Sequence, residues 1–196
     1  MLMGNDPEEV PPLLTVLVRE NLMKITVACA AMLCTLSSVA VWAQAPTDAQ
    51  IAAIVVTANQ VDIDAGKLAK SKGQSKEVQE FAQRMITDHS GVNKSAKELV
   101  QKLHVTPEPN PTSESLQKGG DQNLATLKGL SGSAFDKAYI DHEVAYHEAV
   151  LQAMDKTLIP SAQNAELKAL LVKVRPAFVA HLDHAKQIQA QLKSGA

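Results

Sequence analysis

The sequence of 196 residues is poor in aromatic side chains and in cysteine, and it contains no familiar catalytic motif. Only 3% of the residues are aromatic while 45% are hydrophobic, a balance that favours one mostly helical globular domain. There is no glycine-rich phosphate-binding loop, no G-x-S-x-G motif and no H-E-x-x-H motif. These absences argue against a nucleotide-binding protein, a serine hydrolase and a zinc protease. They favour a protein that is not an enzyme.

The two cysteines, Cys29 and Cys34, both lie in an apolar stretch that has the layout of a secretory signal. A short basic start precedes it, the apolar run is about 19 residues long, and an A-x-A cleavage site follows. We therefore expect residues 23–45 to be a signal peptide, whose removal leaves a mature protein without cysteine. An uncleaved membrane anchor is the alternative.

Residues 1–22 are acidic and contain a pair of prolines, which is unlike the start of a signal peptide. We interpret this segment as an upstream extension or a mis-assigned start, with Met23 as the true first residue. The remaining segment, residues 46–196, is expected to form the folded domain.

The charge of the expected mature domain is balanced. Residues 1–45 contain four of the 21 acidic and two of the 19 basic side chains, so 17 of each remain. Interspersed, neutral charge argues against nucleic acid and against an anionic membrane surface as partners. The expected location is the periplasm or the outer membrane, with a component of the envelope as the expected kind of partner and contact with the membrane only before cleavage. The sequence gives no indication of the oligomeric state.

Four segments show the apolar spacing of amphipathic helices that pack in a bundle. They are residues 47–72, 75–104, 133–158 and 164–192. Between the second and third, residues 105–131 contain prolines and glycines that interrupt the pattern, and we expect a long linker with at most short helical turns near residues 113–118 and 122–128. The predicted fold is all-α, with two helical hairpins joined by this linker.

Each predicted helix places one ionisable residue on its inward apolar face: Asp62, His89, His147 and His181. Glu143 lies one turn before His147 on the same face. Burial of such groups without partners costs a few kcal/mol, and helical bundles build metal sites from imidazole and carboxylate groups on facing helices. Because neutral imidazole suits zinc, copper, iron and nickel, these five residues are the candidate ligands of a transition metal ion.

Two other interpretations remain open. The histidines and carboxylates could form a structural hydrogen-bond network, or Glu143 and His147 could act together as a general base. Counting along the chain from the expected turns at Gly73 and Pro160 places the facing groups on the order of 7–12 Å apart in depth. Two partial polar layers, or a buried hydrogen-bond network, fit that estimate about as well as one compact metal centre.

Four motifs occur in order along the chain: residues 62–69 (DIDAGKLA), residues 78–89 (VQEFAQRMITDH), residues 135–140 (FDKAYI) leading to His147, and Pro176 before His181. Together they resemble an exported, ferritin-like bacterial family of unknown function, whose members are often labelled predicted outer membrane proteins. The resemblance covers residues 47–193. It implies a ferritin-like four-helix bundle in which His89, His147 and His181 occupy the family's histidine positions.

The resemblance brings no established activity with it. Asp62 and Asp64 stand where members of the family tend to carry glutamate. The Glu-x-x-His motif of diiron ferritins is absent, since Glu143 precedes His147 by four residues. The function expected from the sequence is thus that of an exported helical protein that binds a transition metal for metal handling or stress protection. The alternative is a non-enzymatic envelope protein with a buried hydrogen-bond network.

Overall fold

In the computed structural model, the described part of the chain comprises residues 45–194, and it is all-helical without a strand, as predicted. The expected extension (1–22) and all but the last residue of the expected signal peptide (23–45) lie outside it. No helix within residues 45–194 is long and apolar enough to cross a membrane. The elements are α2 (Asp48–Lys72), α3 (Lys76–Lys102), α4 (Pro111–Lys128), α5 (Gly132–Ala153), the π-helix η1 (Met154–Leu158), α6 (Ile159–Ser161) and α7 (Ala165–Ser194).

Hydroxyl and amide side chains fix where three of the helices begin. Thr47 and Ser75 accept hydrogen bonds from the first-turn amides of α2 and α3, and Asn110 does so for α4. These bonds satisfy backbone donors that have no partner inside a helix. The starts of the first two helices therefore agree closely with the sequence prediction.

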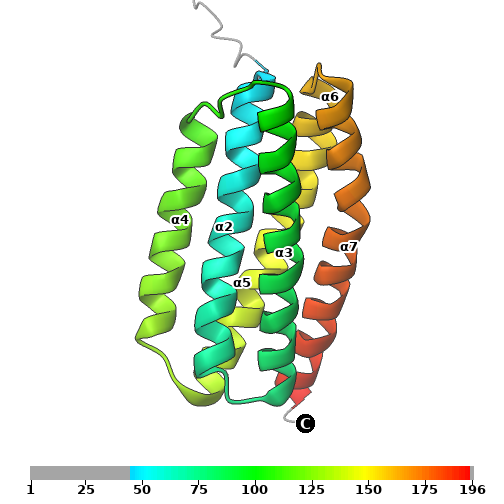
Figure 1. The fold of residues 1–196 in the computed structure, drawn as a ribbon. Coiled ribbons are helices and arrows are strands. Elements are labelled where there is room, and N and C mark those ends of the chain that lie inside the picture. Colours follow the sequence, from blue (N-terminus) through cyan, green and yellow to red (C-terminus); the bar gives the residue numbers. More distant parts are fainter. Residues whose placement is uncertain (1–44, 195–196) are drawn as a thin grey trace, which may run out of the picture. The chain divides into compact units, whose positions relative to one another are not determined.

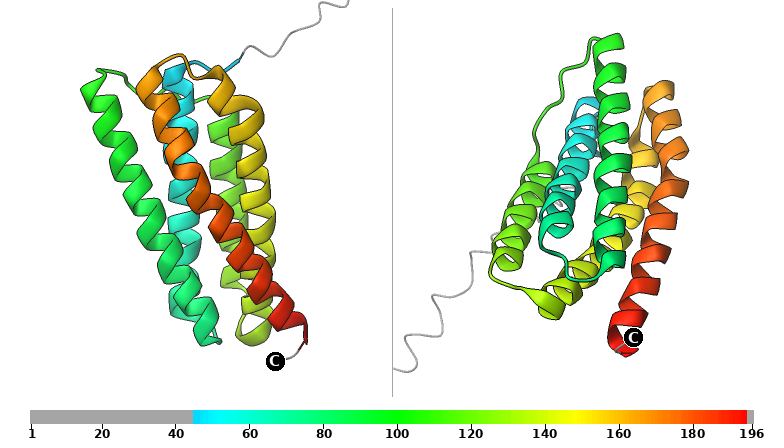
Figure 2. Two further views of the ribbon diagram at one scale, coloured as in Figure 1. Left: turned by 90° about the vertical axis from the view of Figure 1, so that its right-hand side faces the viewer. Right: turned by 60° about the horizontal axis from the view of Figure 1, so that its bottom comes forward.

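The long helices run side by side, with α2 beside α3 and α5 beside α7 (Figures 1 and 2). Two carboxylates tie the ends of these pairs together. Asp136 on α5 accepts hydrogen bonds from the amides of Gln74 and Ser75, in the turn between α2 and α3. At the other end, Asp48 on α2 accepts from the amides that precede α7, those of Gln163 and Asn164. The two hairpins are thus held at both ends.

The expected linker is largely a helix, which corrects the sequence prediction. Its central part forms α4, an uninterrupted helix of 18 residues that packs beside α2 (Figure 1). Asn110 and Pro111 start this helix rather than block it, because proline is favoured in the first turn. Gly120 has a packing role: an added Cβ would lie 2.7 Å from the side chain of Val61. A glycine here permits the close approach of the two helices.

The predicted third helix is continuous to residue 161 but changes its hydrogen-bond pattern. α5 ends at Ala153, and the π-helix η1 covers the last turn of the predicted segment before the short α6. A π-turn adds one residue within a helix and occurs most often as a single turn. The fourth helix runs through Pro176 from Ala165 to Ser194.

Two apolar clusters fill the core at different heights. One contains Phe81, Tyr139 and Ile188, and the other contains Ile51, Leu171 and Phe178. The residues that separate these clusters along α2, α3, α5 and α7 are the buried polar ones. The core therefore consists of two apolar layers with a polar layer between them.

Candidate metal centre

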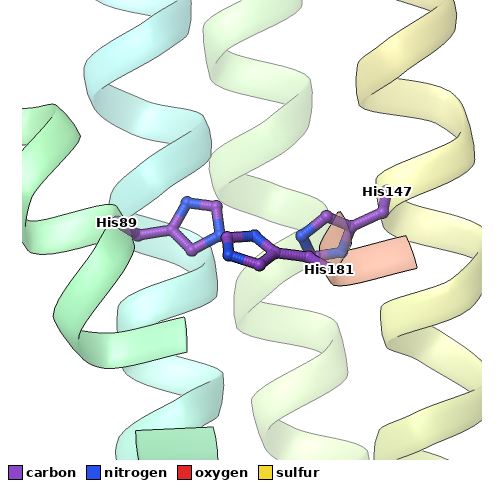
Figure 3. Close-up of side chains that lie close together, drawn as sticks. All are labelled: His89, His147 and His181. Carbon is purple, nitrogen blue, oxygen red and sulfur yellow. The ribbon is translucent and has the colours of Figure 1, made fainter. Parts of the chain in front are cut away.

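Three imidazole rings from three helices converge in the polar layer (Figure 3). His89 comes from α3, His147 from α5 and His181 from α7, and each is at most 1% exposed. Their ring centroids are 5.2 to 5.7 Å apart, and one nitrogen of each lies within 4.8 Å of the others. Three nitrogens that each lie about 2.1 Å from one metal ion are about 3.4 Å apart in a tetrahedral site, so the rings would have to close by up to about 1.4 Å for shared coordination.

Two carboxyl groups complete the cluster. Asp62 on α2 places Oδ2 3.0 Å from Nε2 of His89 and 3.6 Å from Nε2 of His147. Glu143 on α5 places Oε2 3.5 Å from Nδ1 of His147. Asp62, Glu143 and His147 each offer one ligand atom within 4.8 Å of the others. The structure thus brings together all five residues that the sequence analysis proposed as ligands.

The sequence predicted a large difference in depth between Asp62 and His89 and between His147 and His181. This prediction is wrong, because residues were counted from Gly73 and Pro160. Residues in the turns do not rise along the helix axis, so the helix ends are the proper reference. Counted from the ends of α2 and α6 and the starts of α3 and α7, the offsets fall to two or three residues, or about 3–5 Å. An imidazole side chain spans that difference.

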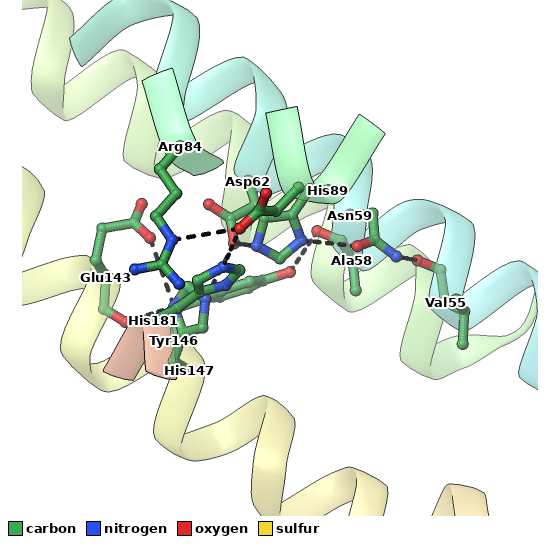
Figure 4. Close-up of polar contacts among 11 residues, drawn as sticks. Val55, Ala58, Asn59, Asp62, Arg84, His89, Glu143, Tyr146, His147 and His181 are labelled. Carbon is green, nitrogen blue, oxygen red and sulfur yellow. Dashed lines mark hydrogen bonds and ion pairs between the residues drawn. The ribbon is translucent and has the colours of Figure 1, made fainter. Parts of the chain in front are cut away.

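The tautomer of His89 is set by Asn59 (Figure 4). The side-chain amide of Asn59 donates to the carbonyl of Val55 at 2.7 Å, which identifies its other atom as the oxygen. That oxygen can only accept, so Nδ1 of His89 carries the hydrogen of their 2.7 Å bond. In the neutral ring, the lone pair is then on Nε2, the atom that faces Asp62.

The other two histidines are fixed in the same way. Nδ1 of His147 donates to the backbone carbonyl of Glu143 at 3.0 Å, and Nε2 of His181 donates to the carboxylate of Asp88 at 2.8 Å. Asp88 is itself held by Arg84 at 3.3 Å. Hydrogen bonds of this kind orient histidines that bind metals, because they fix the tautomer and direct the free nitrogen.

Within residues 45–194, the inward atoms of the cluster have no hydrogen-bond partner. This applies to Nε2 of His89, Nε2 of His147, Nδ1 of His181 and both carboxylate oxygens of Asp62. Buried polar atoms of folded proteins are rarely left unpaired. Five such atoms at one place are therefore the main chemical feature of the core.

The cluster carries a buried negative charge. Burial alone would raise the pKa of Asp62, but the imidazoles of His89 and His147 outweigh it and lower this pKa to about 2. Burial and the charge of Asp62 raise the pKa of Glu143 well above its usual range. At neutral pH, Asp62 is therefore ionised, while Glu143 holds its proton more strongly than an ordinary glutamate.

Burial also favours neutral imidazoles. It lowers the pKa of His147, and it lowers the pKa of His181 to about 4, although nearby carboxylates act in the opposite direction. A neutral imidazole is the form that binds a metal ion. His147 and His181 thus offer neutral nitrogen donors near the anionic carboxylate of Asp62.

Two residues that orient the histidines are not among the five candidate ligands. Asn59 was missed, although its position three residues before Asp62 on α2 places it on the same face. Asp88 bonds to His181 on another helix, although it adjoins His89 in the sequence. Neighbours in a helix sequence point in different directions, so Asp88 reaches the adjacent helix instead.

A family model described as a domain of unknown function (DUF4142) matches residues 35–188. The chain belongs to this family. This confirms the part of the resemblance that concerned a family of unknown function, while its ferritin-like and exported character remain predictions. No curated protein and no solved structure shows a significant match to the chain.

Proposed function

We propose that this protein binds one transition metal ion in the polar layer of its core. The ligands are His89, His147 and His181 with Asp62, and Glu143 lies close enough to join them. One observation carries the proposal: each imidazole donates outward to a fixed acceptor, while its other nitrogen faces the centre without a partner. This is the arrangement expected of metal-binding histidines and their supporting residues.

A purely structural network explains the same atoms less well. A proton on Glu143 provides one donor to Asp62, and an imidazolium at His89 would pair with that carboxylate. Even with both, the inward nitrogens of His147 and His181 keep no partner. Unpaired buried polar atoms cost about 1–3 kcal/mol each, which a bound cation would remove.

The general-base interpretation is weakened by the same environment. A base must be unprotonated at the working pH, and burial beside Asp62 makes Glu143 hold its proton more strongly than an ordinary glutamate. We therefore infer a binding function for metal handling or stress protection, rather than catalysis by Glu143.

The donor set limits the choice of ion. Three imidazole nitrogens and a carboxylate suit zinc, iron, manganese or divalent copper, while copper(I) prefers sulfur ligands. The buried negative charge also favours a divalent cation over an uncharged ligand. We propose a divalent transition metal in a site of three nitrogen donors and one or two oxygen donors.

Metal analysis of untagged protein tests the proposal. Wild-type protein should contain close to one equivalent of metal or take it up from Zn²⁺, Fe²⁺, Mn²⁺ or Cu²⁺, with a higher melting temperature. His147→Ala should lose this uptake. His184→Ala is the matched control, because His184 lies on α7 outside the cluster and should leave uptake unchanged. A wild type that contains no metal and shows no thermal shift with any of these ions would end the proposal.

We further propose that the domain is exported and acts in the cell envelope, as a ferritin-like bundle. The layout of residues 23–45 supports export. N-terminal sequencing of protein from a fractionated cell tests it: the expected first residue lies just after Ala43 or Ala45 in an envelope fraction. Recovery of peptides from residues 1–18 in the isolated protein would contradict it.

A further inference from the structure

A pocket of about 480 Å³ lies between α4 and α5, beside the polar layer but outside it. Its walls include Thr112, Ser115, Leu116 and Gly119 from α4, and His142 and Tyr146 from α5. None of the residues that line it is aspartate, glutamate, lysine or arginine. A ligand that enters this pocket therefore meets no formal countercharge, and an uncharged molecule fits it best.

The α5 side of the pocket offers aromatic surface. The rings of His142 and Tyr146 lie 5.6 Å apart, with their planes at only 17°. The hydroxyl of Tyr146 donates to the carbonyl of Ala58 at 2.9 Å, which fixes the orientation of its ring. Rings held in this way provide a preformed surface for a flat partner.

The pocket also offers polar contacts. Thr112 and Ser115, which line the opposite wall, are exposed residues that carry hydroxyl groups. A ligand that carries a hydroxyl group can exchange hydrogen bonds with them. Ligand pockets in general combine apolar surface with a few such polar groups.

The chain leaves this space unfilled. Gly119 lines the pocket, and a Cβ added there would meet no atom within 4 Å, whereas the adjacent Gly120 is packed tightly against Val61. Gly120 thus lets α4 approach α2, and Gly119 leaves room in the pocket.

We propose that this pocket binds a small, uncharged aromatic molecule that carries a hydroxyl group, of the phenol or hydroquinone class. Its ring packs against His142 and Tyr146, and its hydroxyl bonds to the hydroxyl group of Thr112 or Ser115. Such a ligand would lie next to the candidate metal centre, because the ring of Tyr146 also contacts the ring of His147, with centroids 6.1 Å apart. The proposal does not rest on a bound metal.

Titration with hydroquinone, followed by calorimetry and by the NMR signals of the Tyr146 ring, tests this on metal-free protein. A ligand of this size should bind with a Kd on the order of 0.1–1 mM. 1,4-Cyclohexanediol has two hydroxyls without the aromatic ring, and 4-hydroxybenzoate adds a negative charge. Both should bind at least about tenfold more weakly, because one loses the ring contacts and the other buries an unpaired charge.

A pair of glycine variants locates the site. Gly119→Leu fills the pocket and should raise the Kd for hydroquinone at least about tenfold. Gly91→Leu is the control, because a Cβ at this exposed helical glycine also meets nothing within 4 Å, but Gly91 lies on α3 away from the pocket. Circular dichroism should show both variants folded. Equal binding of cyclohexanediol and hydroquinone, no binding up to 10 mM (about ten times the weaker expected Kd), or unchanged binding by Gly119→Leu would overturn the proposal.

Discussion

Nδ1 of His89 donates a 2.7 Å hydrogen bond to Oδ1 of Asn59, and this bond determines which nitrogen of His89 faces the centre. Asn59 is itself only 2% exposed and is anchored to the carbonyl of Val55. A buried amide on α2 therefore controls the orientation of a candidate ligand on α3, 30 residues later in the chain.

Asn59→Ala should weaken metal binding without removing any ligand. Loss of a residue that orients a ligand typically costs about 10- to 100-fold in metal affinity. The metal-free variant should also be less stable by about 1–3 kcal/mol, because Nδ1 of His89 loses its acceptor. Competition with a chromogenic chelator measures the first effect and urea denaturation the second.

Asn93→Ala is the matched control for this variant. Asn93 is a buried asparagine on α3 that donates to the backbone carbonyl of Val56 and forms no hydrogen bond with a candidate ligand among the described residues. It should lower stability to a similar degree and leave metal affinity within about threefold of wild type. If the two variants lose affinity equally, Asn59 acts only through general stability.

Asp88→Asn tests the outward partner of His181. The neutral amide accepts a weaker hydrogen bond from Nε2 and no longer makes a charged pair with Arg84, so His181 is held less firmly. We expect metal affinity to fall by about tenfold, less than when His181 itself is replaced. Asp64→Asn is the control, since Asp64 is an exposed carboxylate of α2 that pairs with Lys67. An unchanged affinity in Asp88→Asn would show that this contact does not support the site.

The metal-free protein should lose stability as the pH falls from about 6.5 to about 4. Burial lowers the folded-state pKa of His147 and His181, so the unfolded chain binds more protons in this range and acidification favours it. The expected loss is on the order of a few kcal/mol, measured by urea denaturation at a series of pH values.

Protonation of Glu143 should have the opposite effect on the pH dependence of stability in the same experiment. Because its pKa is raised, Glu143 keeps a proton in the folded protein at pH values where the unfolded chain has released it. This difference stabilises the folded protein below the raised pKa, and the stabilisation is lost as the pH rises through that pKa. Glu143→Gln removes this contribution, so its stability should fall more steeply on acidification than that of wild type. Parallel curves would show that Glu143 is not protonated in the folded state.

The two neighbouring glycines of α4 should respond differently to alanine. In Gly120→Ala the added Cβ lies 2.7 Å from the side chain of Val61, and overpacking of this kind costs about 1–3 kcal/mol. In Gly119→Ala the Cβ meets nothing within 4 Å, and alanine should stabilise the helix by up to about 1 kcal/mol. Thermal or urea denaturation measures both, and equal effects would mean that α4 does not pack closely on α2.

Much of the helical pattern can be predicted from the local sequence. Thr47 and Ser75 mark helix starts through the backbone donors that they satisfy, and the apolar spacing identifies the inward faces. The prediction failed for α4, because Gly119 and Gly120 were read as interruptions. Whether a helical glycine weakens a helix or lets it pack closely depends on a neighbour such as Val61, which local sequence does not specify.

By itself, the sequence determined the all-α class, the inward faces of the long helices and the five candidate ligands. Periodicity and burial are properties of one helix at a time, so they can be read from one segment. Only the tertiary structure decided that Asp62, His89, His147 and His181 meet at one level, and that Asn59 and Asp88 turn the free nitrogens inward. Those relations depend on how the turns set the register between helices, and a change of two or three residues in register moves a side chain by about 3–5 Å.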